Sequence, residues 1–455
     1  MTNISAKFSV KQQAALVLVC AVPALITLIF VIKFATNFPY ADQWELVPFL
    51  KKIVNHQPLT LSDLASQHNE HRLLFPRLIM LGLASMTHWN TKYEMYFSYF
   101  LLVCIFAFLL SQLFRLYTQV AIIPHVKFAI ISSCLLLSVL TFSVTQHDNL
   151  LVGWQLQIYL NILAVLFCLF MFSHKEQLTT LDFILAAVAG IIATYSFANG
   201  VLIWPIGFLV LLVRRQLNNS SFYPVLGWVI LSIVILYLYL HNYQKPGQHP
   251  SLLTALYNPK GYVLYVLNYL GTPIVELRLA AVIPPYVGGA VGVVAICLLT
   301  YFLFKDYLFF NRVSLFWHGL LLYALLSAAI TGIGRTGFGA EQAIVSRYVT
   351  ISNLFWMWII VFGVLIIAKH TSMSRPIISI VSIGFCLVIA YYTQGIFRGA
   401  HRLYTDRFGQ GEYLLRNNLI KPTDNSFIYP SGPELIERNE FLRKEKLSFY
   451  YEGNK

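Results

Sequence analysis

An acidic cluster, Ala-Asp-Gln-Trp-Glu at 41–45, is the first group of residues suited to catalysis. The carboxylate of Asp42 can take a proton from a hydroxyl group, and such general-base catalysis contributes roughly 10²–10⁴ in rate. The structural alternative is that Asp42 caps a helix starting near Trp44, whose indole ring then lies at a membrane interface. Spacing alone leaves both interpretations open.

A second cluster, His-Asn-Glu-His-Arg-Leu-Leu-Phe-Pro-Arg, contains five ionisable side chains: His68, Glu70, His71, Arg72 and Arg77. The i, i+3, i+4 spacing predicts that His68, His71 and Arg72 share one face of a helix. Arg72 and Arg77 are candidate phosphate ligands, because a charge-assisted hydrogen bond contributes about 1.5–3 kcal/mol. The alternatives are a solvated helix face with an internal ion pair and a zinc site, although the HExxH spacing is missing.

Polar residues also gather in two short segments, 146–157 and 196–205. In the first, Trp154 and Gln155 suit stacking on a sugar and hydrogen bonding to it, and Asp148 adds a carboxylate. The alternative is a polar turn beside a belt of aromatic residues. In the second, Asn199 and Gly200 predict a tight turn between two apolar runs, either as part of a site or as a plain connection.

A glycine-rich segment at 332–350 carries Arg335, Glu341, Arg347 and Tyr348. It is not a P-loop, because the Gly-Lys-Ser/Thr ending is absent. Glycines allow the backbone to approach an anion closely, and arginines supply the opposite charge. The alternative is a flexible loop whose arginines bind lipid headgroups.

The elements that position these residues follow from composition. Of the 455 residues, 58% are hydrophobic and only 11% are charged. Soluble domains have about 45–50% apolar and about 25% charged residues, so a soluble enzyme is excluded, and so is a disordered chain. The net charge of +13 comes from residues at the ends of apolar runs and in the tail, which indicates membrane topology rather than nucleic-acid binding.

The sequence predicts an all-α polytopic membrane protein with eleven spans, at 13–33, 94–114, 128–145, 156–173, 181–198, 200–213, 223–241, 281–304, 314–333, 349–368 and 376–395. Basic residues occupy alternate loops, including Arg115, Lys127, Lys175, Arg214, Arg215, Lys305, Arg312, Lys369 and Arg375. The positive-inside rule therefore predicts a cytoplasmic N-terminus and outer segments at 34–93, 146–155, 242–280, 334–348 and 396–455.

The first outer segment, 34–93, is predicted to hold two interfacial amphipathic helices, at 45–55 and 73–90. Reading 73–86 as a twelfth span would place Arg115, Arg214 and Arg215 outside, against the positive-inside pattern. The tail at 396–455 is richer in charge and is predicted to be a small soluble appendage outside the membrane domain of 1–395.

One span followed by an acidic outer loop, together with the motifs ADQWE, HNEHRLLFPR, SFANG and RTGFGAEQAIVSRY, resembles the GT-C glycosyltransferases. These polytopic enzymes take a sugar from a polyprenyl-phosphate carrier, and they include the protein O-mannosyltransferases and the lipid A aminoarabinose transferases. The family's catalytic acid corresponds to Asp42. Gln43 follows it here, where many relatives have a second acid, so Glu45 and Glu70 are substitutes. The absence of a WWDxG motif disfavours N-glycosylation.

The resemblance implies transfer of a hexosyl or pentosyl group with inversion, at the periplasmic face of a bacterial inner membrane. The acceptor would be a cell-envelope glycan or lipid such as lipopolysaccharide, a wall polymer or a protein. Its implied roles are a base at Asp42 supported by Glu70, donor-phosphate ligands at Arg72, Arg335 and Arg347, and sugar or acceptor contacts at Trp44, His71, Asp148, Trp154, Gln155, Asn199, Glu341 and Tyr348. The expected partners are the lipid-linked sugar, the acceptor and membrane lipids, without nucleic acid. No cofactor or metal is required, and the alternative is a divalent cation on Asp42 and Asp148.

Two other classes stay open. A flippase or transporter of lipid-linked sugars predicts ionisable groups within the spans, and Asp182 is the nearest candidate. A surface-polysaccharide polymerase predicts a large, late outer loop with arginines, for which 242–280 is the candidate. A membrane-bound acyltransferase would need a histidine deep in a span, and none is evident.

Overall fold

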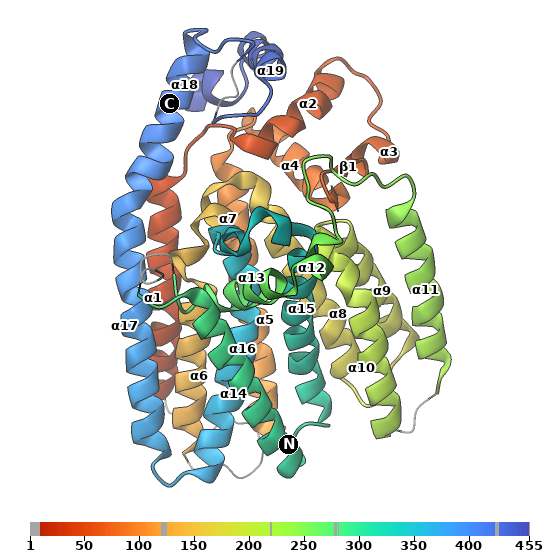
Figure 1. The fold of residues 1–455 in the computed structure, drawn as a ribbon, viewed down its shortest axis with the longest axis vertical. Coiled ribbons are helices and arrows are strands. Elements are labelled where there is room, and N and C mark those ends of the chain that lie inside the picture. Colours follow the sequence, from red (N-terminus) through yellow and green to blue (C-terminus); the bar gives the residue numbers. More distant parts are fainter. Residues whose placement is uncertain are drawn as a thin grey trace.

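The computed structural model describes residues 10–119, 125–218, 221–276, 280, 282–423 and 427–454. Long helices packed side by side form its body (Figure 1). They are α1 (Val10–Phe34), α5 (Lys92–Gln119), α6 (Val126–Thr141), α8 (Leu156–Ser173), α9 (Thr180–Thr194), α10 (Ile203–Asn218), α11 (Tyr223–Leu240), α14 (Pro285–Lys305), α15 (Arg312–Arg335), α16 (Ser346–His370) and α17 (Ser374–Ala400). Within the described residues, ten helices are long and apolar enough to cross a membrane. This confirms an all-α, multi-pass membrane protein.

Each of the eleven predicted spans falls on a helix; α9 is the shortest of these helices and, in the described residues, is not among the ten candidates. Its 15 residues rise about 22 Å at 1.5 Å per residue, which is less than the roughly 30 Å of a bilayer core. The helices α2 (Val47–Val54) and α4 (Leu74–Thr87) confirm that the segments predicted at 45–55 and 73–90 are helical. With 14 residues, α4 is also shorter than a span.

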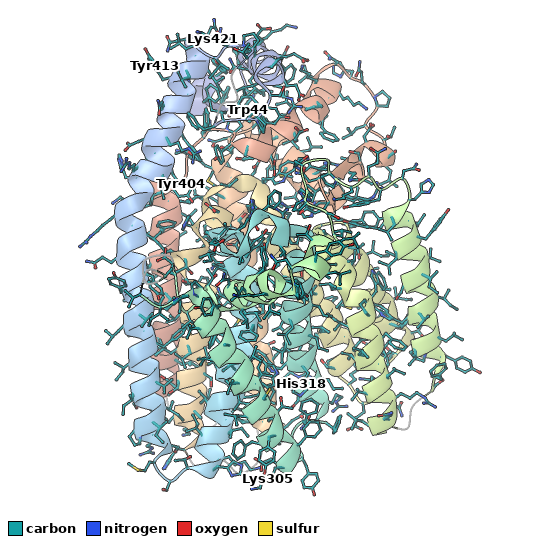
Figure 2. All side chains as sticks on the ribbon, in the orientation of Figure 1. Trp44, Lys305, His318, Tyr404, Tyr413 and Lys421 are labelled. Carbon is teal, nitrogen blue, oxygen red and sulfur yellow. The ribbon has the colours of Figure 1, made fainter. Side chains whose placement is uncertain are left out.

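Shorter elements join the long helices, and some of them gather at one end of the bundle. They are α3 (Leu61–Leu64), α7 (His147–Leu151), α12 (Thr254–Tyr257), α13 (Pro259–Gly271), α18 (Arg407–Arg416), α19 (Gly432–Lys444), β1 (Gln67–His68), β2 (His71–Arg72), the 3-10 turns η2 (Ala41–Leu46), η3 (Val144–Gln146), η4 (Gly153–Gln155), η5 (Ala198–Leu202), η6 (Thr336–Phe338), η7 (Ala340–Ala343), η9 (Ser448–Tyr450) and η10 (Glu452–Asn454), and the π-helical turn η8 (His401–Asp406). Figure 1 shows α2, α3, α4, α18 and α19 together at this end, which we call the site end. In Figure 2, Trp44, Tyr413 and Lys421 lie towards it and Lys305 lies at the opposite end.

The segment 242–280 differs from the outer loop that the sequence predicts. It contains α13, which lies across the long helices in the middle of the bundle (Figure 1). Close packing against α14 holds it there, because a Cβ on Gly271 would come within 1.8 Å of the carbonyl oxygen of Pro285. As a result, Tyr265 and Tyr269 are fully buried inside the bundle.

The tail is also more continuous with the membrane domain than the predicted boundary at 396 suggests. The helical run from Ser374 to Arg416 passes through 396 without a break, and only the π-helical turn η8 interrupts its α-helical pattern.

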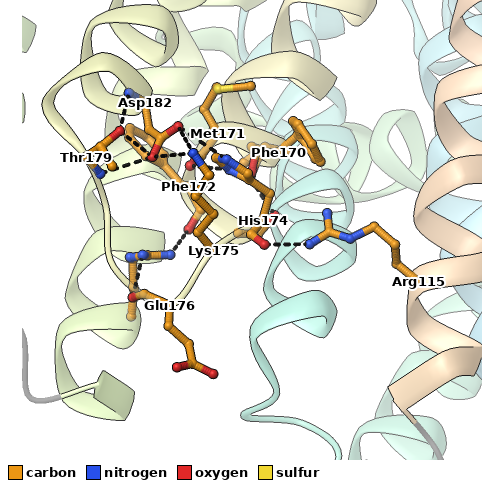
Figure 3. Close-up of polar contacts among 12 residues, drawn as sticks. Arg115, Phe170, Met171, Phe172, His174, Lys175, Glu176, Thr179 and Asp182 are labelled. Atoms are coloured by element: carbon orange, nitrogen blue, oxygen red, sulfur yellow. Dashed lines mark hydrogen bonds and ion pairs between the residues drawn. The ribbon is translucent and has the colours of Figure 1, made fainter. Parts of the chain in front are cut away.

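At the opposite end of the bundle, arginines donate hydrogen bonds to backbone carbonyl oxygens near the end of α8 (Figure 3). Arg115 donates a hydrogen bond to the carbonyl oxygen of His174, at 2.9 Å, just past the end of α8. Arg214 donates to the carbonyl oxygens of Phe172 and Glu176, each at 2.7 Å. These arginines satisfy carbonyl groups that a helix C-terminus leaves without partners.

Large apolar side chains are exposed on the outward faces of several long helices. Examples are Leu18 (65% exposed), Ile233 (64%), Leu298 (58%) and Ile380 (71%). Contiguous exposed apolar surface of this kind suits contact with lipid rather than water.

Candidate active site

A polar cavity of about 250 Å³ lies towards the site end. Eight residues predicted from the sequence line it: Asp42, Glu70, His71, Gln155, Asn199, Arg335, Arg347 and Tyr348. They come from η2, the β1–β2 hairpin, η4, η5, the end of α15 and the start of α16. Further lining residues include Gln157, Gln248, His249 and Tyr269. The structure therefore brings together residues separated by about 300 positions in the chain.

Asp42 faces this cavity from η2, directly after the first long helix. Its Oδ2 atom lies 3.6 Å from Nε2 of His68, and 48% of its side chain is exposed. Burial opposes ionisation, but the nearby imidazole of His68, followed by His71 and Arg347, outweighs it, so the pKa of Asp42 is lowered. Asp42 is therefore an open carboxylate that is ionised at neutral pH.

The histidine cluster is not helical, which makes that prediction wrong. Residues 67–72 form a hairpin, β1 to β2, that turns at Asn69 with a positive φ of 48°, a backbone conformation that asparagine adopts more readily than most residues. His68 pairs directly with His71, and Gln67 pairs with Arg72. Neighbouring strand residues point to opposite faces, so His68 and His71 share one face and Arg72 lies on the other.

The hairpin register explains why the structure does not bring Arg72 to the cavity. Its guanidinium donates to the carbonyl oxygens of Ala65, Tyr239 and His241, at 3.1, 2.7 and 2.6 Å. Arg77 is only 2% exposed and donates to the carbonyl oxygens of residues 64 and 66. Arg77 holds the first outer segment together, Arg72 joins it to the end of α11, and neither lines the cavity.

Glu70 forms an ion pair with Arg335 at the cavity wall. His71 and His249 place their Nε2 atoms 3.8 and 3.7 Å from its carboxylate. Burial opposes ionisation, but the charges of His71 and Arg335 and the hydrogen bond from Arg335 lower the pKa of Glu70 to about 2. The carboxylate of Glu70 is therefore held in the ion pair with Arg335, so Glu70 is a weaker candidate for the general base than Asp42.

His71 is held as a neutral hydrogen-bond donor. Its Nδ1 atom accepts a hydrogen bond from the backbone N–H of Ala198 at 3.0 Å, and its ring stacks on Phe197 at 4.6 Å. Burial lowers the pKa of His71 to about 4, although Glu70 opposes this change. The imidazole is neutral at pH 7, and its proton lies on Nε2, because Nδ1 is an acceptor.

Arg347 differs from Arg335 in having no charged partner. Within the described parts of the chain, its guanidinium makes no hydrogen bond or ion pair; it lies 5.4 Å from the ring of Tyr348. Tyr348 in turn stacks on Tyr269, with ring centroids 5.0 Å apart. Arg347 is therefore a cation available to an anionic ligand.

Three buried polar atoms of the cavity residues lack a hydrogen-bond partner in the described structure. One is Oε2 of Glu70, which lies 3.7 Å from Nε2 of His249. The other two are Oε1 of Gln157, a residue that is 3% exposed, and the hydroxyl of the fully buried Tyr269. Asn199 lies in a turn that requires glycine next to it, because a Cβ on Gly200 would come within 1.9 Å of the carbonyl oxygen of Ala193.

The volume of the cavity, about 250 Å³, lies just below the roughly 300–1,000 Å³ of typical small-molecule sites, which suits one sugar ring.

Five predicted residues do not line the cavity: Arg72, Trp44, Asp148, Trp154 and Glu341. Trp44 and Trp154 are 0% and 1% exposed and pack in the core, where Trp154 meets the ring of His68 edge-on at 5.1 Å. Asp148 accepts a hydrogen bond from Tyr404 at 2.8 Å and lies 3.3 Å from His147. Glu341 is exposed in η7.

Sequence reasoning missed His249 and Tyr269, which lie in the segment read as a loop. A signal for α13 was present, because Asn258 followed by Pro259 is a typical helix start, with an N-cap and proline at the first position. The stacking of the Tyr269 ring on the Tyr348 ring depends on helix packing and has no signal in the sequence.

Neither a metal site nor a transport site gains support from the described side chains. No group of three or more histidine, cysteine, aspartate or glutamate side chains is arranged to hold a metal ion in the described ranges. Asp148, the second oxygen ligand of the alternative with a cation, is bonded away from the cavity. Asp182, the transporter candidate, lies in the first turn of α9 at the opposite end. Its carboxylate accepts a hydrogen bond from the backbone N–H of Thr179 at 3.0 Å and lies 3.2 Å from His174 and Lys175 (Figure 3).

Comparisons with protein-family models, with curated proteins and with solved structures find no match to this chain. The function is therefore argued from the cavity itself. An ionised carboxylate, a neutral imidazole donor, one free and one paired guanidinium, and several amides can together deprotonate a hydroxyl group and hold an anionic group beside it.

Proposed function

We propose that this protein is a membrane glycosyltransferase of the GT-C kind. It transfers a sugar from a polyprenyl-phosphate carrier to a hydroxyl group of a cell-envelope acceptor, at the outer face of a bacterial inner membrane. One observation carries the proposal: the open carboxylate of Asp42 and the free guanidinium of Arg347 face the same small polar cavity.

In the proposed reaction, Asp42 accepts the proton of the acceptor hydroxyl. The acceptor oxygen attacks the anomeric carbon from the face opposite the phosphate, and the bond between that carbon and the phosphate oxygen breaks. The electron pair stays on the lipid phosphate, whose added negative charge Arg347 stabilises. The anomeric configuration inverts, and no co-reactant is needed.

The other cavity residues have supporting roles in this proposal. Arg335 is held by Glu70, so it contributes a fixed positive field rather than a free ligand. His71 offers its Nε2 proton to a sugar or phosphate oxygen. Gln155, Gln157 and Asn199 supply amides for sugar hydroxyl groups. They provide the sugar contacts in this proposal, because Trp154, to which the sequence assigned such a contact, does not line the cavity.

The test is sugar transfer by the purified full-length protein with a panel of labelled polyprenyl-phosphate sugars and membrane extract as acceptor. We expect release of polyprenyl phosphate by the wild type and a loss of at least a hundredfold in Asp42→Asn. Asp406→Asn is the matched control, because Asp406 also lies beside a histidine, His401, at 3.0 Å but does not line the cavity.

Arg347→Gln is expected to weaken donor use by at least tenfold, whereas Arg375→Gln, at the far start of α17, leaves it unchanged. Absence of transfer from every donor contradicts the proposal and directs attention to lipid-linked sugar transport, tested by flipping in liposomes. Transfer that survives Asp42→Asn retains the reaction but removes Asp42 as the base.

A further inference from the structure

The C-terminal segment, residues 427–454, packs against η2, the turn that carries Asp42. The backbone N–H of Ala41 donates to the carbonyl oxygen of Ile428 at 2.9 Å. Ala41 has a positive φ of 49°, an uncommon conformation for a residue with a Cβ. The residue just before Asp42 is thus held in an unfavourable backbone conformation by a contact from near the other end of the sequence.

Glu45 extends this contact to the other end of η2. It accepts hydrogen bonds from Arg438, at 2.9 Å, and from the hydroxyl of Tyr429. Arg438 is 11% exposed in its side chain, lies 4.7 Å from the ring of Tyr429 and also bonds Glu434 at 2.7 Å. A partly buried, charge-assisted pair of this kind restrains both partners more than an exposed surface pair does.

Further contacts tie the same two regions together. Lys51 of α2 forms an ion pair with Glu437 at 2.5 Å. The backbone N–H of Ser448 donates to the carbonyl oxygen of His88 at 2.8 Å, and Tyr451 stacks on the ring of His88 at 3.9 Å. The C-terminal segment therefore contacts the first outer segment at several places.

The opposite side of η2 meets the membrane domain. Gln43 donates to the carboxylate of Glu94 at 2.7 Å, and Asp42 faces His68 and the cavity. Since η2 is only six residues long, its orientation is set by what packs on both sides. Loss of Arg438 removes the ion pair that restrains Glu45, at the end of η2 that follows Asp42.

We infer that Arg438 is a positioning residue, which holds η2 through Glu45 so that Asp42 meets His68 and points into the cavity. The C-terminal segment then completes the site rather than forming a separate appendage. The catalytic consequence rests on the proposed function, whereas the structural consequence for Asp42 does not.

The effect of Arg438 on the placement of residue 42 is tested by introducing a thiol at that position. In Asp42→Cys, the rate of labelling by a charged, membrane-impermeant thiol reagent reports the exposure and charge environment of that position. We expect Arg438→Ala to change this rate at least fivefold, and Arg438→Lys to restore most of it. Protein without the Asp42→Cys change gives the background from the native cysteines.

Arg443→Ala is the matched control for the labelling. Arg443 lies on the same helix, α19, but bonds to Leu415, Arg416 and Asn418 within the C-terminal region and makes no hydrogen bond or ion pair with η2 in the described structure. A labelling rate that Arg438→Ala leaves unchanged, or that Arg443→Ala changes equally, overturns the positioning role whatever reaction the protein catalyses.

The catalytic consequence uses the transferase assay. We expect Arg438→Ala to lower kcat at least tenfold with a donor KM within twofold of wild type, and to shift the acidic limb of the pH profile upward, since Asp42 loses contact with His68. A protein that merely unfolds more easily loses active molecules without moving that limb. Altered labelling without any transferase activity in the wild type retains the positioning role and rejects the proposed function.

Discussion

The ion pair between Glu70 and Arg335 should couple the first outer segment to the end of α15, across 265 positions of sequence. The pKa of Glu70 falls from 4.5 to about 2, a difference of 2.5 units. At about 1.36 kcal/mol per unit, this corresponds to about 3 kcal/mol of stabilisation. Burial opposes this shift, and the charge of His71 is the largest influence that favours it.

The expected coupling at pH 7 is smaller than this figure, because His71 is then neutral. Its own pKa is about 4, so its charge does not act on Glu70 at neutral pH. Arg335 alone remains, and a hydrogen bond between charged groups contributes roughly 1.5–3 kcal/mol. We therefore expect a coupling of about 2 kcal/mol. Since the pKa is lowered in the folded state, this stabilisation is fully present above pH 4.5 and is lost as the pH falls towards 2.

A double-mutant cycle measures this coupling directly. The variants are Glu70→Gln, Arg335→Gln and the combination, with unfolding free energies from SDS titration in mixed micelles at pH 7. The pair Glu412–Arg416, exposed and four residues apart on α18, is the control and should give about 0.3–0.5 kcal/mol. A coupling for Glu70 and Arg335 no larger than the control's would refute the reasoning.

Two further predictions concern the turn at Asn199 and the pH dependence of the proposed reaction. Gly200→Ala should cost about 3 kcal/mol of stability in the same titration, because its Cβ would meet a backbone oxygen at 1.9 Å, whereas Gly363→Ala, inside α16 with open space around it, should be neutral or stabilising by up to about 1 kcal/mol. The acidic limb of kcat/KM should lie below the ordinary aspartate pKa of 3.8, and Arg347→Gln should move it upward, because Arg347 helps to lower the pKa of Asp42; an unmoved limb contradicts the assignment.

The long helices could be predicted because each needs only a sustained apolar run, which is a local property of the sequence. The hairpin at 67–72 could not, since His68 and His71 lie on one face both at helical spacing and across a two-residue turn. The choice between these two arrangements reversed the assignment of Arg72, which shares a helical face with them but lies on the opposite face of the hairpin.

Charge in the sequence pointed to some residues of the cavity but not to others, such as Arg72 and Glu341, because packing decides which charged side chains reach it. Arg335 and Arg347 are conspicuous in a glycine-rich segment between apolar runs, and both reach the cavity. The difference between them depends on Glu70, which pairs with one and leaves the other free. Tyr269 reaches the cavity only because α13 lies across the bundle, held by glycines on two helices.

The buried polar atoms of the cavity bear on whether it is a binding site or a packing defect. Leaving a buried donor or acceptor without a partner costs about 1–3 kcal/mol, and both Gln157 and Tyr269 carry such an atom in the described structure. An apolar side chain at either position would remove that cost if the cavity only filled space. A ligand with hydroxyl groups can donate to Oε1 of Gln157 and bond the hydroxyl of Tyr269, while Arg347 meets its negative charge. These residues therefore favour an occupant that is both hydroxylated and anionic, as the proposed sugar phosphate is.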